Sequence, residues 1–252
     1  MKIVRLKQIE DYVNAKQSAT LEELSDAFNV SLMTIRRDIE SLSREGAIKK
    51  VYGGVTATNS RDLLTFEERD IVEMDEKKKI AKAAAQFIQK NDVVFIDSGT
   101  TTRYIVDYLD KDLTATIISN SLDIFNTVSN YPNINLITVG THFNKRTRSF
   151  VGKENWPIIE KYNISKGMFS CTSLSLEKGA SITDISEYEM KKRAFAKVSQ
   201  SFLLVDKSKM NTESALTFAH IQDFDMIITD SEVPDFAQYC SENNVHYLVA
   251  ED

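Results

Sequence analysis

Short apolar runs alternate with segments of helical periodicity through the second part of the chain, and this alternation restricts the fold more than any other feature. The apolar runs predict strands at Val93–Ile96, Ala115–Ile118, Ile134–Val139, Met168–Thr172, Phe202–Val205, Met226–Thr229 and Val245–Val249. Helical patterns fall at Arg103–Leu109, Leu122–Ser129, Trp156–Tyr162, Glu187–Val198 and Phe236–Ser241. We therefore predict an α/β fold over residues 76–252, with a mainly parallel sheet covered on both faces.

Ligands of such sheets bind beyond the carboxyl ends of the strands. After the first predicted strand, a turn with one glycine leads into a helical pattern, and its residues are Asp97, Ser98, Gly99, Thr100, Thr101 and Thr102. Unpaired backbone N–H groups at a helix start attract anions, and hydroxyl groups add further donors. This stretch is predicted to hold a phosphate or carboxylate group. The alternative is an ordinary helix cap, which needs only one hydroxyl.

Other strand ends add candidates for the same rim of the sheet. Ser119 and Asn120 follow the second strand, Arg148 lies after the third, and Asp206 and Lys209 follow the fifth. A basic side chain is the usual charge partner of a phosphate. The alternatives are a helix cap at 119–121, a solvated basic loop at 145–148 and a surface ion pair at 206–209.

The first 57 residues have the pattern of a helix-turn-helix module with a wing. Helical spacing covers residues 2–16, Thr20–Glu23 matches a capping box for a second helix, and Ser31 caps a third helix that is closed by Gly46. Two helices joined by a turn of a few residues are typical of a helix-turn-helix. The Gly-Gly pair at 53–54, which lies between β-forming residues, predicts a hairpin.

The third helix presents residues that can contact DNA. Arginine can donate two hydrogen bonds to guanine, and threonine can form hydrogen bonds with bases or phosphates. Leucine or methionine can contact the thymine methyl group. The candidates at its N-terminal end are Ser31, Leu32, Met33, Thr34, Arg36 and Arg37, and those on the wing are Lys49, Lys50, Tyr52 and Gly53. The alternative is a small helical module with a solvated charged face.

Composition agrees with a division into a DNA-binding head and an acidic body. The net charge is −6, but residues 1–57 hold nine basic and eight acidic residues. A linker is expected over 58–75, followed by an amphipathic helix at Glu76–Lys90. Two cysteines, three scattered histidines and the lack of a membrane-spanning run predict a cytoplasmic protein without a metal site. A dinucleotide cofactor is not expected, because GxGxxG is absent.

Several motifs resemble the DeoR family of bacterial repressors across almost the whole chain. They are Val30-Ser31-x-x-Thr34-Ile35-Arg36-Arg37-Asp38-Ile39, the Lys49–Val55 wing, Asp97–Thr101, Ser119–Ser121, Ser149–Gly152, Glu187 with Lys191, and Asp206-x-Ser208-Lys209. Tyr52 stands where the family usually has histidine, and Val139-Gly140 where it has Gly-Gly. The resemblance implies a winged helix-turn-helix and a sensor domain similar to ribose-5-phosphate isomerase and glucosamine-6-phosphate deaminase. It also implies that Lys77, Glu187, Lys191, Asp206 and Lys209 respond to or contact a sugar phosphate.

These features favour a repressor that binds operator double-stranded DNA as a homodimer or homotetramer, because palindromic operators mirror two-fold symmetry. Within the family, the sequence is most similar to repressors of inositol catabolism, which implies a phosphorylated keto-sugar acid as effector. One alternative is an isomerase or deaminase of sugar phosphates with an accessory DNA-binding domain. Another is an activator that responds to a ligand without phosphate.

Overall fold

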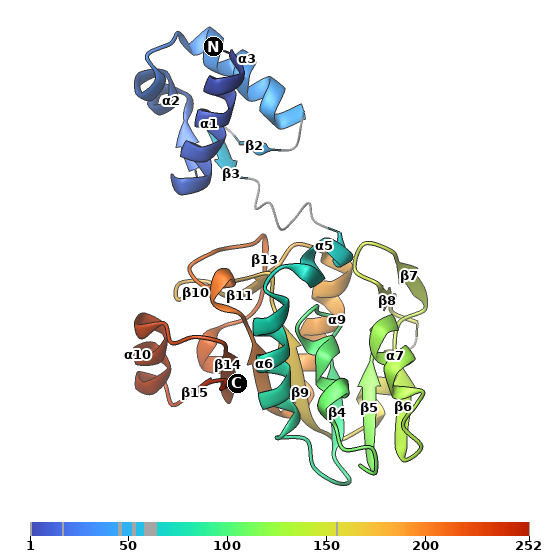
Figure 1. Cartoon of the computed structure of the whole chain (residues 1–252). Coiled ribbons are helices and arrows are strands. Elements are labelled where there is room, and N and C mark those ends of the chain that lie inside the picture. The colour runs from blue at the N-terminus through green and yellow to red at the C-terminus, as the bar shows by residue number, and fades with distance from the viewer. Residues whose placement is uncertain are drawn as a thin grey trace. The chain divides into compact units, whose positions relative to one another are not determined.

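The chain divides into two units, Met1–Leu64 and Thr65–Asp252, which are treated separately below (Figure 1). The structure is a computed structural model, and it describes residues 2–16, 18–44, 47–51, 54–57, 65–154 and 156–251 of the 252-residue chain.

Helices and a small antiparallel sheet form the described part of the first unit. The elements are α1 (Lys2–Lys16), β1 (Ser18–Thr20), α2 (Leu21–Phe28), α3 (Leu32–Arg44), β2 (Ile48–Val51) and β3 (Gly54–Ala57), and the strand order is β1-β3-β2. Ile9 and Val13 of α1 pack with Leu24 of α2 and with Ile35 and Ile39 of α3. The predicted helix pair and the hairpin that follows it are confirmed.

Local capping signals set the turn between α2 and α3. The Thr20 hydroxyl accepts a hydrogen bond from the backbone N–H of Glu23 at 3.1 Å, and the Glu23 carboxylate accepts one from the N–H of Thr20 at 2.8 Å. This is the predicted capping box. Asn29 then ends α2 in the left-handed region, with φ of 48°, and the Ser31 hydroxyl accepts from the N–H of Thr34 at 3.3 Å at the start of α3.

A seven-stranded parallel sheet forms the centre of the second unit. The strands are β4 (Val93–Ile96), β5 (Ala115–Ser119), β6 (Ile134–Thr138), β9 (Ile164–Ser170), β12 (Val198–Leu204), β14 (Met226–Thr229) and β15 (His246–Val249). Their order is β15-β14-β12-β9-β4-β5-β6, and every neighbouring pair is parallel. The chain runs outward from β4 to one edge, returns to β9 and runs to the other edge, so the order reverses between β4 and β9. The predicted parallel α/β fold is confirmed.

Helices cover both faces of this sheet (Figure 1). On one face, α6 (Met74–Ala85), the 3-10 helix η1 (Thr102–Tyr108) and α7 (Leu122–Val128) pack in a cluster that contains Val94 and Ile96 of β4. On the other face, α8 (Pro157–Lys161), α9 (Ile185–Phe195) and α10 (Pro234–Glu242) pack in a cluster that contains Phe95. The alternation along β4 follows from the two-residue period of a strand.

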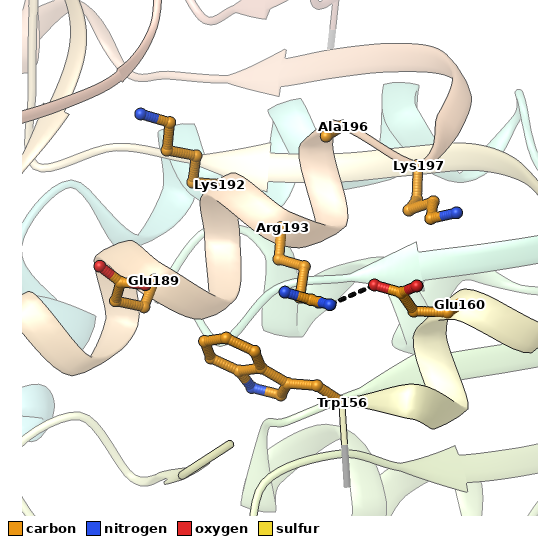
Figure 2. A pocket seen from close by; sticks show the side chains of 7 residues that line it. All are labelled: Trp156, Glu160, Glu189, Lys192, Arg193, Ala196 and Lys197. Carbon is orange, nitrogen blue, oxygen red and sulfur yellow. Dashed lines mark hydrogen bonds and ion pairs between the residues drawn. The ribbon is translucent and has the colours of Figure 1, made fainter. Parts of the chain in front are cut away.

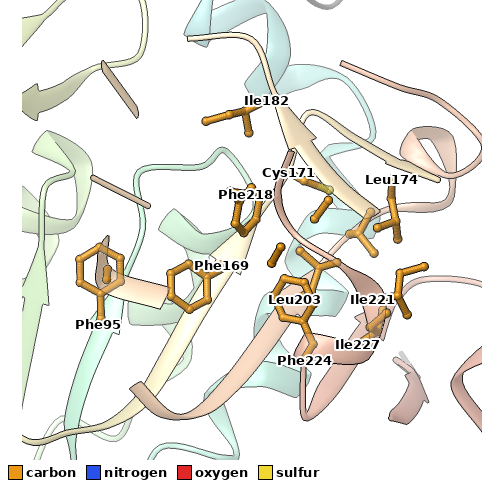
Figure 3. Close-up of a cluster of buried hydrophobic side chains, with 14 of the residues drawn as sticks. Phe95, Phe169, Cys171, Leu174, Ile182, Leu203, Phe218, Ile221, Phe224 and Ile227 are labelled. Atoms are coloured by element: carbon orange, nitrogen blue, oxygen red, sulfur yellow. The ribbon is translucent and has the colours of Figure 1, made fainter. Parts of the chain in front are cut away.

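Aromatic side chains dominate the second of these clusters, around Phe169 of the central strand β9 (Figure 3). The Phe169 ring centroid lies 5.7 Å from that of Phe95, 5.3 Å from that of Phe195 and 6.4 Å from that of Phe218. Such offset and tilted contacts are favourable for aromatic rings beyond the apolar area that they bury.

Several elements of the second unit were not predicted from the sequence. They are α5 (Phe66–Ile71), the hairpin of β7 (His142–Asn144) and β8 (Ser149–Val151), the antiparallel sheet of β10 (Ser173–Ser175), β11 (Gly179–Ile182) and β13 (Leu216–Ala219), and the 3-10 turns η2 (Lys207–Lys209) and η3 (Ile221–Asp223). All five of these strands have only three or four residues, which is too short for a period of two to be distinctive.

Two sequence-based boundaries are corrected by the structure. Residues 65–75 were expected within a linker, but they belong to the second unit and contain α5, which begins with a capping box between Thr65 and Glu68. The helix expected at 76–90 extends instead over Met74–Ala85. Residues 58–64 of the predicted linker, together with Gly46, lie outside the described residues.

The segment after the threonine turn is a 3-10 helix and not the predicted α-helix. The Thr102 hydroxyl donates to the backbone carbonyls of Asp97 and Gly99, at 3.2 and 3.1 Å, and thereby competes with regular helical bonding. The β-branched residues Ile105 and Val106 also disfavour an α-helix. In the described part of the chain, no helix is both long and apolar enough to cross a membrane.

Replacing Phe169 by alanine is expected to lower the free energy of unfolding by about 3–5 kcal/mol, because the cavity would open at the centre of the aromatic cluster. The matched control is Phe143→Ala on β7, since that ring is 42% exposed; it should cost less than about 1 kcal/mol. Urea unfolding monitored by circular dichroism measures both values. Equal losses for the two variants would contradict the assignment of the core.

Candidate functional site

One candidate site is the exposed side of α3. Leu32 and Met33 are large apolar residues that are 39% and 59% exposed, and Arg36 and Arg37 are also exposed. Apolar side chains can contact a thymine methyl group, and arginines can donate to guanine. This face therefore has the chemistry that direct contact with base edges requires.

The opposite side of α3 is fixed to the first unit. Ile35, Ile39 and Leu42 are buried, and the buried carboxylate of Asp38 pairs with the Arg5 guanidinium of α1 at 2.7 Å. This bidentate contact orients α3 so that the Arg36 and Arg37 side chains remain exposed.

The wing candidates are only partly defined by the structure. Lys50 on β2 is exposed and forms an ion pair with Glu40 of α3. Lys49 lies on β2, but its side chain is outside the described set. Tyr52 and Gly53 lie outside the described residues altogether.

The second candidate site lies where the strand order reverses, at the carboxyl ends of β4 and β9. Ligands of open α/β sheets bind at such points. The predicted turn after β4 is almost completely buried there, and its residues with low exposure are Asp97, Ser98, Thr100, Thr101 and Thr102. The hydroxyl of Thr101 has no hydrogen-bond partner among the described residues.

Asp97 is the most highly connected carboxylate of this rim. Its side chain forms an ion pair with Lys191 of α9, accepts the backbone N–H groups of Gly99 at 3.0 Å and Ser170 at 2.7 Å, and accepts the Thr102 hydroxyl. Burial acts to raise the pKa of Asp97, but the Lys191 ammonium and the hydrogen bonds outweigh it and hold the pKa below its usual value. Asp97 is therefore a charged structural centre of the turn.

Gly99 and Ser170 allow β4 and β9 to close together at the rim. A Cβ atom on Gly99 would lie 1.8 Å from the Ser170 hydroxyl oxygen, so no other residue fits without displacement. The Ser170 hydroxyl donates to Asp97 at 3.1 Å, and its carbonyl accepts from Lys191 at 2.9 Å. Ser170 was not among the predicted site residues. Its place at the end of β9 is the signal that could have identified it.

Glu187 of α9 gathers donors from three other segments. Its buried carboxylate accepts the Ser98 hydroxyl at 2.7 Å, the Asn120 amide at 3.5 Å and the Ser149 hydroxyl. Ser149 begins β8 and also contacts the Thr147 hydroxyl at 2.7 Å. The structure therefore brings together predicted residues from the ends of β4 and β5 and from α9.

Some predicted site residues have structural partners instead of an open position. The Ser119 hydroxyl donates to the carbonyl of Ile96 at 2.7 Å and accepts the N–H of Ser121 at 3.1 Å. Ser121 in turn caps α7, as the alternative interpretation of this segment proposed. The buried ammonium of Lys77 on α6 donates to the carbonyls of Arg69 and Val72 at the end of α5.

Arg148 connects the hairpin to two helices. Its guanidinium binds Asp123 of α7 through two hydrogen bonds, at 2.9 and 3.1 Å, and lies 3.6 Å from the carboxylate of Glu67 on α5. The residue has a left-handed backbone with φ of 50°, which is uncommon for a non-glycine residue. The predicted basic loop is therefore partly anchored at this position and not freely solvated.

Asp206 and Lys209 form a second buried ion pair at 3.2 Å, on η2 after β12. The alternative of a surface pair is excluded, because both side chains are at most 10% exposed. Burial raises the pKa of the Cys171 thiol to about 12, while Lys209 and Lys191 act in the opposite direction. The two ion pairs follow different strands of the sheet, with Asp97 after β4 and Asp206 after β12.

A surface cavity of about 370 Å³ lies elsewhere, between α8 and the outer side of α9 (Figure 2). Arg193 stacks on the Trp156 indole at 4.8 Å and forms an ion pair with Glu160. None of the predicted effector residues lines this cavity. Among the described residues, no group of three His, Cys, Asp or Glu side chains is placed to hold a metal ion.

Asp97→Asn is expected to lower the free energy of unfolding at pH 7 by about 3–5 kcal/mol, because Lys191 would remain buried without its partner. The pKa of Asp97 is lower in the folded protein than in the unfolded chain, where it is about 4, so the carboxylate stabilises the fold fully above that pH. This contribution is lost as the pH falls through the lower pKa of the folded protein. The difference between wild type and variant should therefore shrink in acid. Urea titrations between pH 3 and pH 7 measure this dependence.

The double variant Asp97→Asn/Lys191→Met serves as the control for that experiment, because it removes both charges together. It should be more stable than Asp97→Asn alone. A single variant as stable as the wild type at pH 7 would contradict the central role of this ion pair.

Comparison with known proteins agrees with the division of the chain into two units. Residues 5–61 match the DeoR-like helix-turn-helix domain, and residues 72–231 match the DeoR C terminal sensor domain. The HTH-type transcriptional regulator IolR of Bacillus subtilis (strain 168) is 44% identical over 97% of this chain and 98% of its own length. The L-fucose operon activator of Haemophilus influenzae is 27% identical, over 94% and 96% of the two chains.

Among solved structures, ribose 5-phosphate isomerase A of Methanocaldococcus jannaschii aligns with a TM-score of 0.42 and 17% identity, over 55% of each chain. The full-length sorbitol operon regulator SorC of Klebsiella pneumoniae aligns with a TM-score of 0.40 and 8% identity, over 83% of this chain and 90% of its own.

The sequence relatives are named as regulators and not as enzymes, so this chain is a DNA-binding transcriptional regulator and the enzyme alternative is set aside. The predicted family resemblance is confirmed. Since the two family matches cover both units and IolR is similar over nearly the full length, this protein belongs to the DeoR family of transcriptional regulators.

Proposed function

We propose that this protein represses an operon for carbohydrate or polyol catabolism in the cytoplasm. In this proposal, a phosphorylated sugar or keto-sugar acid releases it from operator DNA after binding at the rim around the Asp97–Thr102 turn. No cofactor is required by this function.

The exposed side of α3 supports the DNA-binding part of the proposal. A recognition helix enters the major groove with its N-terminal residues toward the bases. The residues exposed near that end of α3 include Leu32, Met33, Arg36 and Arg37. Lys50 on the wing is exposed and suited to a phosphate contact. Operators with two-fold symmetry favour a homodimer or homotetramer.

One observation carries the effector part of the proposal: a dense set of buried hydrogen-bonding groups at the point where the strand order reverses. Burial of polar groups is costly unless each has a partner, so such sets are retained where they have a role. The set combines hydroxyls of the turn with the lysines of two ion pairs, which suits a ligand that carries both hydroxyls and an anion. The relative named L-fucose operon activator adds a link to carbohydrate operons.

Release of DNA would be a shift between two populations of the protein. An effector can shift this equilibrium only by its difference in affinity for the DNA-binding and released forms. The rim is joined to α5, the first element of the second unit, through the contact of Arg148 with Glu67. This contact connects the proposed effector site to the first helix of the second unit.

Thermal-shift titration of the full chain with phosphorylated sugars and inositol-derived keto acids tests the effector class. A true effector should raise the melting temperature in a saturable way and release a fluorescent operator fragment at the same concentrations. The same panel without phosphate is the control. A reporter gene behind the operator measures the sign of regulation, and induction by the unphosphorylated compounds alone would contradict the proposal.

Arg36→Ala or Arg37→Ala is expected to weaken operator binding by about 1–3 kcal/mol if the side chain forks onto a base. Arg44→Ala is the matched control, because it removes the same charge from the exposed last turn of the same helix. Fluorescence anisotropy at a fixed salt concentration gives the dissociation constants. The recognition-helix assignment fails if both Arg36→Ala and Arg37→Ala bind the operator as tightly as the wild type.

Lys209→Ala is expected to leave operator binding within about twofold of wild type and to abolish release by the effector, because the rim would lose one of its ammonium groups. Lys207→Ala removes the same charge from an exposed position on the same turn and should respond normally. Operator release is measured for both variants, with melting curves to verify folding. A normal effector response of a folded Lys209→Ala protein would contradict the role of Lys209.

A further inference from the structure

Glu187 is a buried negative charge that is held by neutral groups. Glu187 lies in the first turn of α9 and is only 8% exposed. The hydroxyls of Ser98 and Ser149 and the amide of Asn120 donate to the two carboxylate oxygens. A buried carboxylate normally has a cationic partner or a shifted protonation equilibrium. Here the donors come from three loops of the rim.

The nearby cations are already engaged elsewhere. Lys191 lies one helical turn further along α9, but its ammonium pairs with Asp97. Lys209 pairs with Asp206. Among the described residues, no Lys or Arg lies within ion-pair distance of Glu187. With both ion pairs neutral overall, Glu187 leaves this part of the rim with a net negative charge.

Hydroxyl and amide donors that converge on a carboxylate form the same arrangement that binds a ligand anion. Ser98 and Asn120 belong to the set proposed above for the effector. A phosphate and the Glu187 carboxylate cannot accept from the same donors together, because two like charges within a few ångströms repel strongly in a buried site.

We propose that Glu187 acts as an internal anion that occupies the binding cradle in the absence of effector, and that a phosphate monoester must displace it. This inference rests on the proposed effector site and deepens it. Glu187 then determines specificity: a neutral sugar gains little by competing with a bound carboxylate, whereas a dianion makes stronger bonds to the same donors. The ligand class is therefore a phosphorylated compound.

Displacement of Glu187 also connects ligand binding to contacts elsewhere in the sensor. The carboxylate joins α9 to Ser149, which is adjacent in sequence to Arg148. Arg148 in turn contacts Asp123 of α7 and Glu67 of α5. Breaking the contact between Glu187 and Ser149 therefore removes one of the contacts that hold the start of β8.

The test compares Glu187→Gln with wild type in the full-length protein. Calorimetric titration with inorganic phosphate and with the phosphorylated sugar that gives the largest thermal shift measures affinity. The neutral amide removes the competing charge and keeps the shape of the side chain, so we expect binding at least about tenfold tighter for both probes. The unphosphorylated form of the same sugar should bind equally to the two proteins.

Glu189→Gln is the matched control. It removes the same charge from the same helix, but Glu189 is 43% exposed and lies 3.8 Å from Lys153 on the outer side. Its affinity for phosphate should equal that of wild type. Glu187→Asp provides a second variant, since the shorter side chain keeps the charge but withdraws it from the donors; it should bind phosphate with an affinity between those of wild type and Glu187→Gln. Melting curves verify that each variant folds.

The outcomes separate this inference from the proposed function. If the sugar phosphate binds wild type, but Glu187→Gln binds it equally or more weakly, the internal-anion role is overturned and the effector site stands. Weaker binding would identify Glu187 as an acceptor for a sugar hydroxyl. If neither phosphate probe binds any of the proteins, both the phosphate site and the inference from it are overturned.

Discussion

The sensor domain depends on the buried ion pair between Asp97 and Lys191. This pair joins the end of β4 to α9, and through Ser170 it also holds the end of β9. These are the two strands between which the sheet order reverses. The connections from these two strands lead to opposite edges of the sheet, which leaves a crevice at their carboxyl ends. Here charge-assisted hydrogen bonds span that crevice. The geometry of the threonine turn follows from that closure.

The distribution of charge around this pair explains why the site suits a sensor. Asp97 and Asp206 each have a lysine partner, so these four groups contribute no net charge. Glu187 is held only by neutral hydroxyl and amide donors. In the proposed exchange these donors bind another anion instead, and no cation is left without a partner. A sensor requires such exchange, because its ligand must bind and leave reversibly. A fully neutralised rim would give the protein stability but no means of selecting an anion.

The sequence predicted the sheet well because buried parallel strands are continuous apolar runs, as at Val93–Ile96 and Met226–Thr229. Because strand ends share one edge, it also placed Ser98 and Asn120 near each other, and both donate to Glu187. It could not predict their partners. Asp97 was expected either to accept a sugar hydroxyl or to fix the turn, but its bonds to Lys191 and Ser170, which cross 94 and 73 residues, were not predictable. The 3-10 form of η1 was missed for a different reason, because helical periodicity does not reveal the local bond from Thr102 to the turn before it.

Buried ion pairs hold part of each unit in place, but the groups that they leave available differ between the two units. In the first, the buried pair of Asp38 and Arg5 fixes one side of α3 and leaves arginines and apolar residues on the other side exposed, where we propose that they contact DNA. In the second, buried pairs fix the rim and leave one carboxylate bonded to neutral donors, which we propose a ligand can take over. A rigid surface favours sequence recognition, whereas an exchangeable contact favours a change of state. The regulator needs both, because DNA binding and effector binding are linked equilibria.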